Sequence, residues 1–190
     1  LASSEVTDEE AQVEEASSDL NTQQNIYRET DLTAFNPEPE LFYEASYQEK
    51  LRSMIDAILD NEAPIRDDVL AQKIARAHGW ARSGRIIREH VFSFLESASN
   101  TNESTGRFIW NQESPAAVLE YRFPDLQENL RPIDEITIAE LCGFIEINKE
   151  LLLESDPALS IAREMGISRL TGASRERVEE AIRDYQFKLV

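Results

Sequence analysis

An internal repeat is the feature of this chain that most constrains its fold. Residues 74–91 and 161–178 align without a gap at an offset of 87, and eight of the eighteen aligned positions are identical. The shared residues describe a helix stopped by a glycine, a turn, and a second helix opened by arginines. This is the outline of a helix-turn-helix, a unit that often reads nucleic acid. Chance similarity between two amphipathic stretches is the alternative, but internal repeats are strong evidence of organisation.

Helical spacing of apolar residues extends through most of the chain after residue 45. Gly79 and Gly166 are placed to end helices in the left-handed conformation, and Ser83 is placed to cap the helix that follows the first of them. Together these signals predict helices over residues 46–61, 67–78, 84–98, 136–152, 157–165 and 174–187.

Two β-rich stretches interrupt the helical pattern. Residues 107–110 and 118–123 flank a loop that contains Pro115, and we interpret them as a β-hairpin. Three helices followed by a hairpin is the winged-helix order. The predicted fold is therefore mainly α, of the α+β class. It consists of a winged-helix-like helix-turn-helix with a β-hairpin wing, and a second helix-turn-helix repeat.

Charge divides the chain into unequal parts. The formal net charge is -18, and residues 1–44 hold twelve acidic residues and one basic residue, so this stretch alone carries -11. It is poor in apolar residues, which predicts an acidic disordered linker or tail, with order beginning near Tyr43. Residues 45–130 would form the winged-helix-like unit. Residues 131–190 would form the second helix-turn-helix unit, packed on the first.

The chain lacks signals for secretion or membrane insertion. Cys142 is the sole cysteine and excludes an intramolecular disulfide. No run of 18 apolar residues is present, so we expect no membrane contact. Neither a basic nor an apolar signal-peptide region begins the chain. We expect a cytoplasmic protein, and a chain that is a piece of something longer because it has no initiator Met.

One stretch is positive in an otherwise acidic chain. Residues 69–88 contain no Asp or Glu. An arginine fork suits both phosphate and guanine, and the start of a recognition helix commonly reaches bases. On this basis the predicted nucleic-acid-binding residues are Lys73, Arg82, Arg85 and Arg88, with Arg107 and Arg122 of the hairpin adding backbone contacts.

A purely structural role for these arginines is the competing interpretation. Arg76, Arg82 and Arg88 recur in the second copy, so they are the stronger candidates for tying the turn to a neighbouring helix. Lys73 and Arg85 become Ser160 and Gly172, which favours them for a function peculiar to the first copy. Nucleic-acid contact by the second copy is the weaker hypothesis.

Catalytic and cofactor motifs are absent from the sequence. The histidines His78 and His90 do not have zinc-ligand spacing, and no phosphate-binding glycine loop or nucleophile elbow is present. We therefore expect no metal, no cofactor and no catalytic residue in this chain, and hence no enzymatic activity of its own.

Several short motifs resemble a known family. They are Glu62-Ala63-Pro64-Ile65, Ile74-Ala75-Arg76, Gly79, Arg82, Gly84-Arg85-Ile86, Phe108-Ile109-Trp110 and Arg131-Pro132-Ile133-Asp134-Glu135-Ile136. Over about residues 45–190 the chain resembles domain-of-unknown-function family 3320, found at the C-terminal end of very large bacterial proteins. The resemblance implies that superfamily-one helicase and restriction-endonuclease-like domains lie upstream in the same polypeptide, and that this parent is a DNA-processing helicase or nuclease.

Two functional hypotheses follow. The first is a non-catalytic auxiliary module that binds nucleic acid, with DNA as the expected partner. The alternative is a protein-protein or intramolecular docking module without nucleic-acid contact, which the mainly acidic composition favours.

Overall fold

The computed structural model describes residues 25–111, 115–125 and 130–188. In these residues the α-helices are α1 (Gln48–Glu62), α2 (Asp67–Ala77), α3 (Arg85–Ser93), α4 (Ile138–Ile147), α5 (Pro157–Glu164) and α6 (Gly172–Lys188). The strands are β1 (Ile26–Tyr27), β2 (Ile65–Arg66), β3 (Asn100–Glu103), β4 (Gly106–Ile109) and β5 (Phe123–Pro124). Short 3-10 helices are η1 (Thr33–Phe35), η2 (Pro39–Leu41), η3 (Ala45–Tyr47), η5 (Ile133–Glu135) and η6 (Lys149–Leu153). The mainly helical α+β class predicted from the sequence is confirmed.

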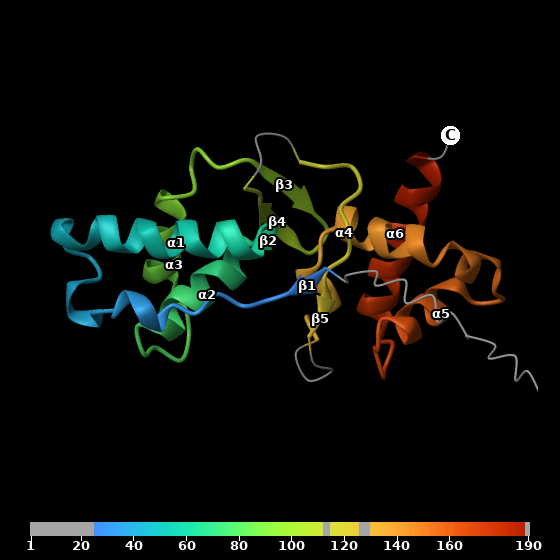
Figure 1. Ribbon diagram of the computed structural model, residues 1–190, viewed down its shortest axis with the longest axis horizontal. Coiled ribbons are helices and arrows are strands. Elements are labelled where there is room, and N and C mark those ends of the chain that lie inside the picture. The colour runs from blue at the N-terminus through green and yellow to red at the C-terminus, as the bar shows by residue number, and fades with distance from the viewer. Residues whose placement is uncertain (1–24, 112–114, 126–129, 189–190) are drawn as a thin grey trace, which may run out of the picture.

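The molecule is elongated and has two hydrophobic cores. Helices α1–α3 lie at one end, α4–α6 at the other, and a small sheet lies between them (Figure 1). One core contains Leu51 and Ile74, and the other contains Phe144 and Ile161. Tyr121 packs in the second core, although it precedes the boundary expected at residue 130. No described helix is both long and apolar enough to cross a bilayer.

The folded part of the chain begins well before Tyr43. Leu32 and Phe42 are buried in the first core, and β1 pairs in parallel with β5. Phe42 is fully buried and meets the rings of His78 and Trp80 edge-on, with centroids 4.8 and 4.9 Å away. The expected disordered tail therefore does not extend over residues 25–44, because apolar side chains in this stretch have places to pack. Residues 1–24 lie outside the described part of the chain.

The first unit has the element order α1, β2, α2, α3, β3, β4. Apolar side chains of α1 recur at helical spacing, and Leu51, Met54, Ile55 and Ile58 are all buried. Strands β2, β4 and β3 form an antiparallel sheet in that spatial order, with Ile65 opposite Ile109 and Thr101 opposite Phe108. The short strand before α2 is thus joined to the hairpin that follows α3.

The predicted hairpin had the wrong partner strand. Strand β4 pairs with β3 and β2, whereas residues 118–122 form no strand. Strand β3 has the sequence Asn-Thr-Asn-Glu, whose polar residues favour a turn more than a strand. It nevertheless pairs, because it is an edge strand whose side chains need little burial.

Residues 118–122 instead run across α4. The amide of Leu119 donates to the carbonyl oxygen of Ala139 at 2.9 Å. A Cβ atom on Gly143 would lie 1.9 Å from the Leu119 carbonyl oxygen, so only glycine permits this approach. Cys142, on the same helix, is fully buried.

The internal repeat is a structural repeat. Helix α2 ends at Ala77 and α5 at Glu164, and α3 begins at Arg85 and α6 at Gly172; both pairs are 87 residues apart. Gly79 and Gly166 have φ of 80° and 82°. The amides that follow them donate five residues back, Trp80 to Ala75 and Ile167 to Ala162, at 3.0 and 2.9 Å. Gly79 and Gly166 thus both end helices in the left-handed conformation, as the sequence predicted.

Candidate nucleic-acid interface

The turn after α2 and the first turn of α3 present arginines to solvent. Arg82 and Arg88 are exposed, and Arg85 has 76% of its side chain exposed. Arg85 donates to Glu89, one turn later, at 2.8 Å. The predicted cap at Ser83 is not formed; its amide and hydroxyl instead donate to Gln72 Oε1, at 3.0 and 3.2 Å. These bonds fasten the turn to α2, so the turn that displays Arg82 is held by its neighbours.

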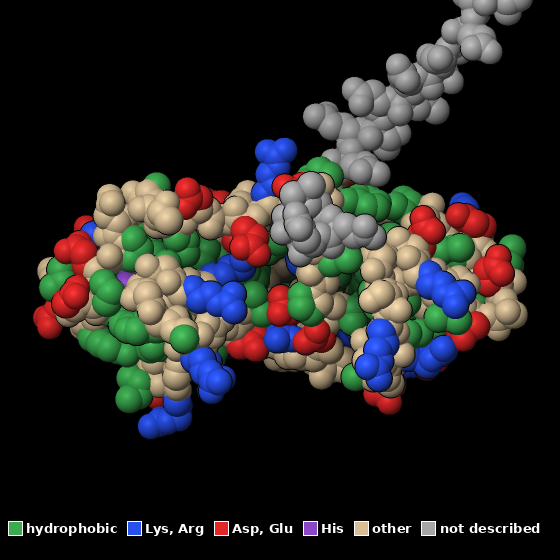
Figure 2. Space-filling model, turned by 90° about the horizontal axis from the view of Figure 1, so that it is seen from below, with side chains coloured by type: hydrophobic (Ala, Val, Ile, Leu, Met, Phe, Trp, Pro, Cys, Tyr) green, Lys and Arg blue, Asp and Glu red, His purple; other side chains and the backbone are tan. Residues whose placement is uncertain are grey.

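Lys73 and Arg107 are already engaged by acidic residues. Lys73 Nζ lies 3.2 Å from Glu62 Oε2 and 3.3 Å from Glu29 Oε2. Arg107 Nε lies 2.8 Å from Asp67 Oδ2. The basic stretch is therefore less positive in the fold than in the sequence, because its carboxylate partners come from other segments. On the face shown in Figure 2, Lys and Arg side chains are interspersed with Asp and Glu.

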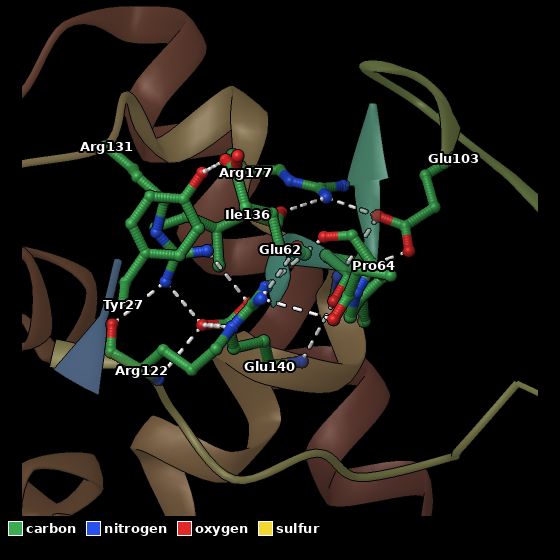
Figure 3. A network of polar contacts seen from close by, with 12 residues as sticks. Tyr27, Glu62, Pro64, Glu103, Arg122, Arg131, Ile136, Glu140 and Arg177 are labelled. Atoms are coloured by element: carbon green, nitrogen blue, oxygen red, sulfur yellow. Dashed lines mark hydrogen bonds and ion pairs between the residues drawn. The ribbon is translucent and has the colours of Figure 1, made fainter. Parts of the chain in front are cut away.

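Arg122 does not lie at the surface. It is 8% exposed, and its Nη2 donates to Glu140 Oε2 at 2.8 Å (Figure 3). Its Nη1 and Nη2 also donate to the carbonyl oxygens of Glu62 and Pro64, at 2.7 and 3.2 Å. The prediction that Arg122 contacts a nucleic-acid backbone is wrong. Its segment is folded across α4, and its donors bind groups inside the protein.

Arg122 belongs to a buried network that joins the two units, and this network was missed in the sequence. Glu140, on α4, also accepts from Arg131 Nη1 at 3.0 Å. Burial alone would raise the pKa of Glu140, but the charges and hydrogen bonds of Arg131 and Arg122 outweigh it and lower that pKa. Tyr27 donates to Glu62, and burial together with this carboxylate raises the pKa of the Tyr27 hydroxyl. The network therefore holds the two units together through charged arginine and glutamate side chains.

The hairpin formed by β3 and β4 also contributes to the contact between the two units. Glu103, at the end of β3, pairs with Arg177 of α6 and accepts from the amide of Ile138 at 3.0 Å. Arg177 is 2% exposed and also donates to the carbonyl oxygen of Ile136 at 2.7 Å. The tip of the hairpin is thus fixed against the second unit (Figure 3). Of the six predicted contact residues, only Arg82, Arg85 and Arg88 lie together on an exposed surface.

The two copies hold equivalent arginines in different ways. Arg175 forms a fork with Asp156, with both N–O distances 2.9 Å, and lies 3.7 Å from Glu179. At an offset of 87, these carboxylates correspond to Val69 and Phe92 in the first copy. Within the described residues, Arg88 forms no ion pair, and neither do Arg76 and Arg82. The recurring arginines, which the sequence favoured as structural, are the unpaired ones in the first copy.

Both histidines pack against aromatic rings of the first unit. His78 is buried, with Nε2 2.8 Å from the Tyr47 hydroxyl and Nδ1 2.8 Å from the carbonyl oxygen of Ile74. Burial lowers the pKa of His78. The ring of His90 packs among those of Phe42, Tyr43 and Phe94. The described residues contain no group of three or more His, Cys, Asp or Glu side chains that could hold a metal ion.

Comparison with known proteins gives one match. No curated protein and no solved structure matches the chain. Residues 40–89 match the model of the family described as "Protein of unknown function (DUF3320)". The matched part contains α1, α2 and the start of α3, and therefore most of the first copy of the repeat and none of the second. The match supports a DUF3320 domain at residues 40–89 and so agrees with the sequence resemblance over this stretch, whereas the resemblance was predicted to extend to residue 190.

Proposed function

We propose that this chain is a non-catalytic auxiliary module that binds nucleic acid through the first helix-turn-helix. The parent would be a larger DNA-processing protein of the helicase or nuclease type, as the sequence resemblance implies. The recognition element would be α3 together with the turn before it, and the contact residues would be Arg82, Arg85 and Arg88.

The topology of the first unit supports the proposal. Its element order, with a strand before α2 that pairs with the second strand of the hairpin, resembles that of a winged helix. In DNA-binding helix-turn-helix proteins the second helix of the motif enters the major groove. Helix α3 occupies that place here, and Val91 is its one fully buried residue. Its outer face is therefore accessible.

The observation that carries the proposal is that Arg88, unlike Arg175, has no carboxylate partner among the described residues. The second copy shows that two carboxylates are compatible with this backbone, since Asp156 and Glu179 hold Arg175 there. The first copy has Val69 and Phe92 at those places, which leaves the guanidinium without an anion among the described residues. Arginine without a carboxylate partner is suited to phosphate, whose geometry matches the same fork.

A matched pair of charge reversals tests the proposal. Arg82→Glu changes an exposed, unpaired arginine of the first copy, and Arg169→Glu changes its exposed equivalent in the second. We expect Arg82→Glu to weaken duplex binding about tenfold, from the loss of a charge-assisted contact, and Arg169→Glu to leave it unchanged. Fluorescence anisotropy of a labelled duplex and a labelled single strand measures both. Log K should fall with log salt by about 0.9 per phosphate neutralised.

No binding of either probe at low salt, or equal losses from the two reversals, would reject the nucleic-acid function. The second candidate, a protein docking module, would then take its place. It is favoured by the net charge of -18 and by Ile147 and Leu153 of the second unit, whose side chains are exposed. Such apolar residues on an acidic surface suit a protein partner better than a polyanion.

A further inference from the structure

A polar pocket lies beside the first helix-turn-helix, where α2 and α3 meet the segment that leads into the second unit. Its volume is about 400 Å³. Side chains from β2, α2, α3 and residues 130–135 line it. The basic residues among them are Arg66, Lys73, Arg76, Arg88 and Arg131. Three acidic residues, Glu29, Asp68 and Glu135, also line the pocket, so five bases face three acids in a chain whose net charge is -18.

Three of these bases are held by carboxylates. Arg66 binds Asp68 and also Asp134, whose Oδ2 lies 2.8 Å from Nη1. Lys73 is placed by Glu62 and Glu29, and Arg131 by Glu140. Arg76 and Arg88 differ, because neither forms an ion pair within the described residues. The pocket is therefore lined by three bases in ion pairs and by two cations, Arg76 and Arg88, whose guanidinium groups have no carboxylate partner among the described residues.

The acidic residues do little to satisfy these two cations. Asp68 and Glu29 are bound to Arg66 and Lys73. Glu135 forms no ion pair within the described residues; burial raises its pKa, and the charge of Arg66 opposes that rise. Among the described lining residues, the two unpaired cations, Arg76 and Arg88, therefore outnumber the one unpaired carboxylate.

We propose that this pocket binds a terminal phosphate group, with Arg76 and Arg88 as the residues that contact it. A phosphate monoester carries close to two negative charges and three terminal oxygens, enough to accept from two guanidinium forks at once. Carboxylate offers only two oxygens and one charge. The volume lies within the range of roughly 300–1,000 Å³ that small-molecule pockets occupy, and it exceeds what one phosphate fills. The phosphate would therefore arrive on a carrier the size of a nucleotide.

Two sources supply this chemistry: a free nucleoside monophosphate, and the 5′-phosphorylated end of a nucleic-acid strand. Neither Arg82 nor Arg85 lines the pocket. Arg88 belongs to both surfaces, so this inference shares that residue with the proposed function. Substitutions at Arg82 or Arg85 test groove binding without changing the pocket, and substitutions at Arg76 test the pocket without changing the proposed groove contacts.

Calorimetric titration of the full chain at low salt is the test. The probes are a deoxynucleoside 5′-monophosphate, the same nucleoside without phosphate, and a short single strand with a 5′-phosphate or a 5′-hydroxyl. We expect the phosphorylated probes to bind more tightly than their phosphate-free partners. Arg88→Gln and Arg76→Gln should each weaken binding about tenfold. Arg163→Gln, the exposed equivalent of Arg76 in the second copy, is the matched control and should leave binding unchanged.

A phosphorylated strand that binds more tightly than the free nucleotide identifies a strand end as the ligand, and equal affinities identify the nucleotide. Equal binding of probes with and without phosphate would overturn the proposal. So would a Kd weaker than about 1 mM for every phosphorylated probe, or unchanged binding in both Arg88→Gln and Arg76→Gln. Arg82→Glu should not affect the mononucleotide. If it abolishes duplex binding while the nucleotide still binds, the phosphate pocket functions without Arg82 even though Arg88 belongs to both surfaces.

Discussion

The two helix-turn-helix copies share a backbone and differ in what surrounds their arginines. Helix ends, glycine conformations and the hydrogen bonds of the turn coincide at an offset of 87. Arg175 is nonetheless fixed by Asp156, whereas Arg88 faces a pocket. Identity at a repeated position therefore indicates a shared turn and not a shared role. The role depends on neighbours that the repeat does not conserve.

The copies also differ in how they are covered. The first is flanked by a three-stranded sheet and by the segment that contains Leu32 and Phe42. The second is packed against α4, and its Arg177 pairs with Glu103 of the hairpin. This difference places the buried charges between the copies. Of the three recurring arginines, only the last differs in its partners: Arg175 is paired with Asp156, and Arg88 has no carboxylate among the described residues.

The largest effect should come from breaking the junction that keeps the copies together. Arg122→Met removes a buried partner of Glu140 and takes a donor away from backbone carbonyls. We expect the free energy of unfolding to fall by about 3–5 kcal/mol, the usual cost of removing one side of a buried ion pair. Urea denaturation measures this. Arg85→Met is the control, since its exposed pair with Glu89 should contribute less than about 1 kcal/mol; similar losses would contradict a structural role for Arg122.

A smaller effect tests whether the copies are equivalent in energy as well as in shape. Gly79→Ala and Gly166→Ala each place a Cβ at positive φ, which costs about 1–2 kcal/mol. We expect equal losses in thermal or urea unfolding. Gly84→Ala is the control, because Gly84 has φ of -66° and a Cβ there would meet nothing within 4 Å. Clearly unequal losses at the two turns would show that surrounding structure relieves one of them.

The smallest effect would convert one copy toward the other. Asp156→Asn keeps a good helix cap but removes the charge that holds Arg175. In an Arg82→Glu background, where the first copy is weakened, we expect duplex affinity to rise by about two- to fivefold, on the scale of an exposed ion pair. Anisotropy at low salt measures the gain. Adding Arg175→Gln should cancel it, and a gain that survives this second change would exclude Arg175 as its source.

Local signals in the sequence predicted the local structure well. Gly79 and Gly166 were located as left-handed helix ends because glycine adopts positive φ at little cost and the repeat marked both. Apolar spacing placed the helices to within a few residues, except that α3 ends at Ser93 rather than near residue 98, and α4 gives way to η6 after Ile147. These features depend on residues close in sequence.

Long-range pairing was not predictable in the same way. Strand β3 has no apolar alternation, so nothing in its sequence identifies it as the partner of β4. Arginine is usually an exposed residue, and nothing close to Arg122 in the sequence indicates that it is buried. Its partner Glu140 lies on a helix 18 residues later. Lys73 is neutralised from Glu29 and Glu62, which precede the basic stretch. A charge count along the chain cannot separate free cations from those that distant carboxylates hold.

The bond between the hairpin and α6 makes each unit part of the other's surface. Glu103 of the first unit meets Arg177 of the second, and both side chains are largely buried. A protein without the second unit would expose Glu103 without its cation, and one without the first would leave Arg177 with Glu180 as its carboxylate partner. Neither unit would therefore present this surface in the same form if it stood by itself.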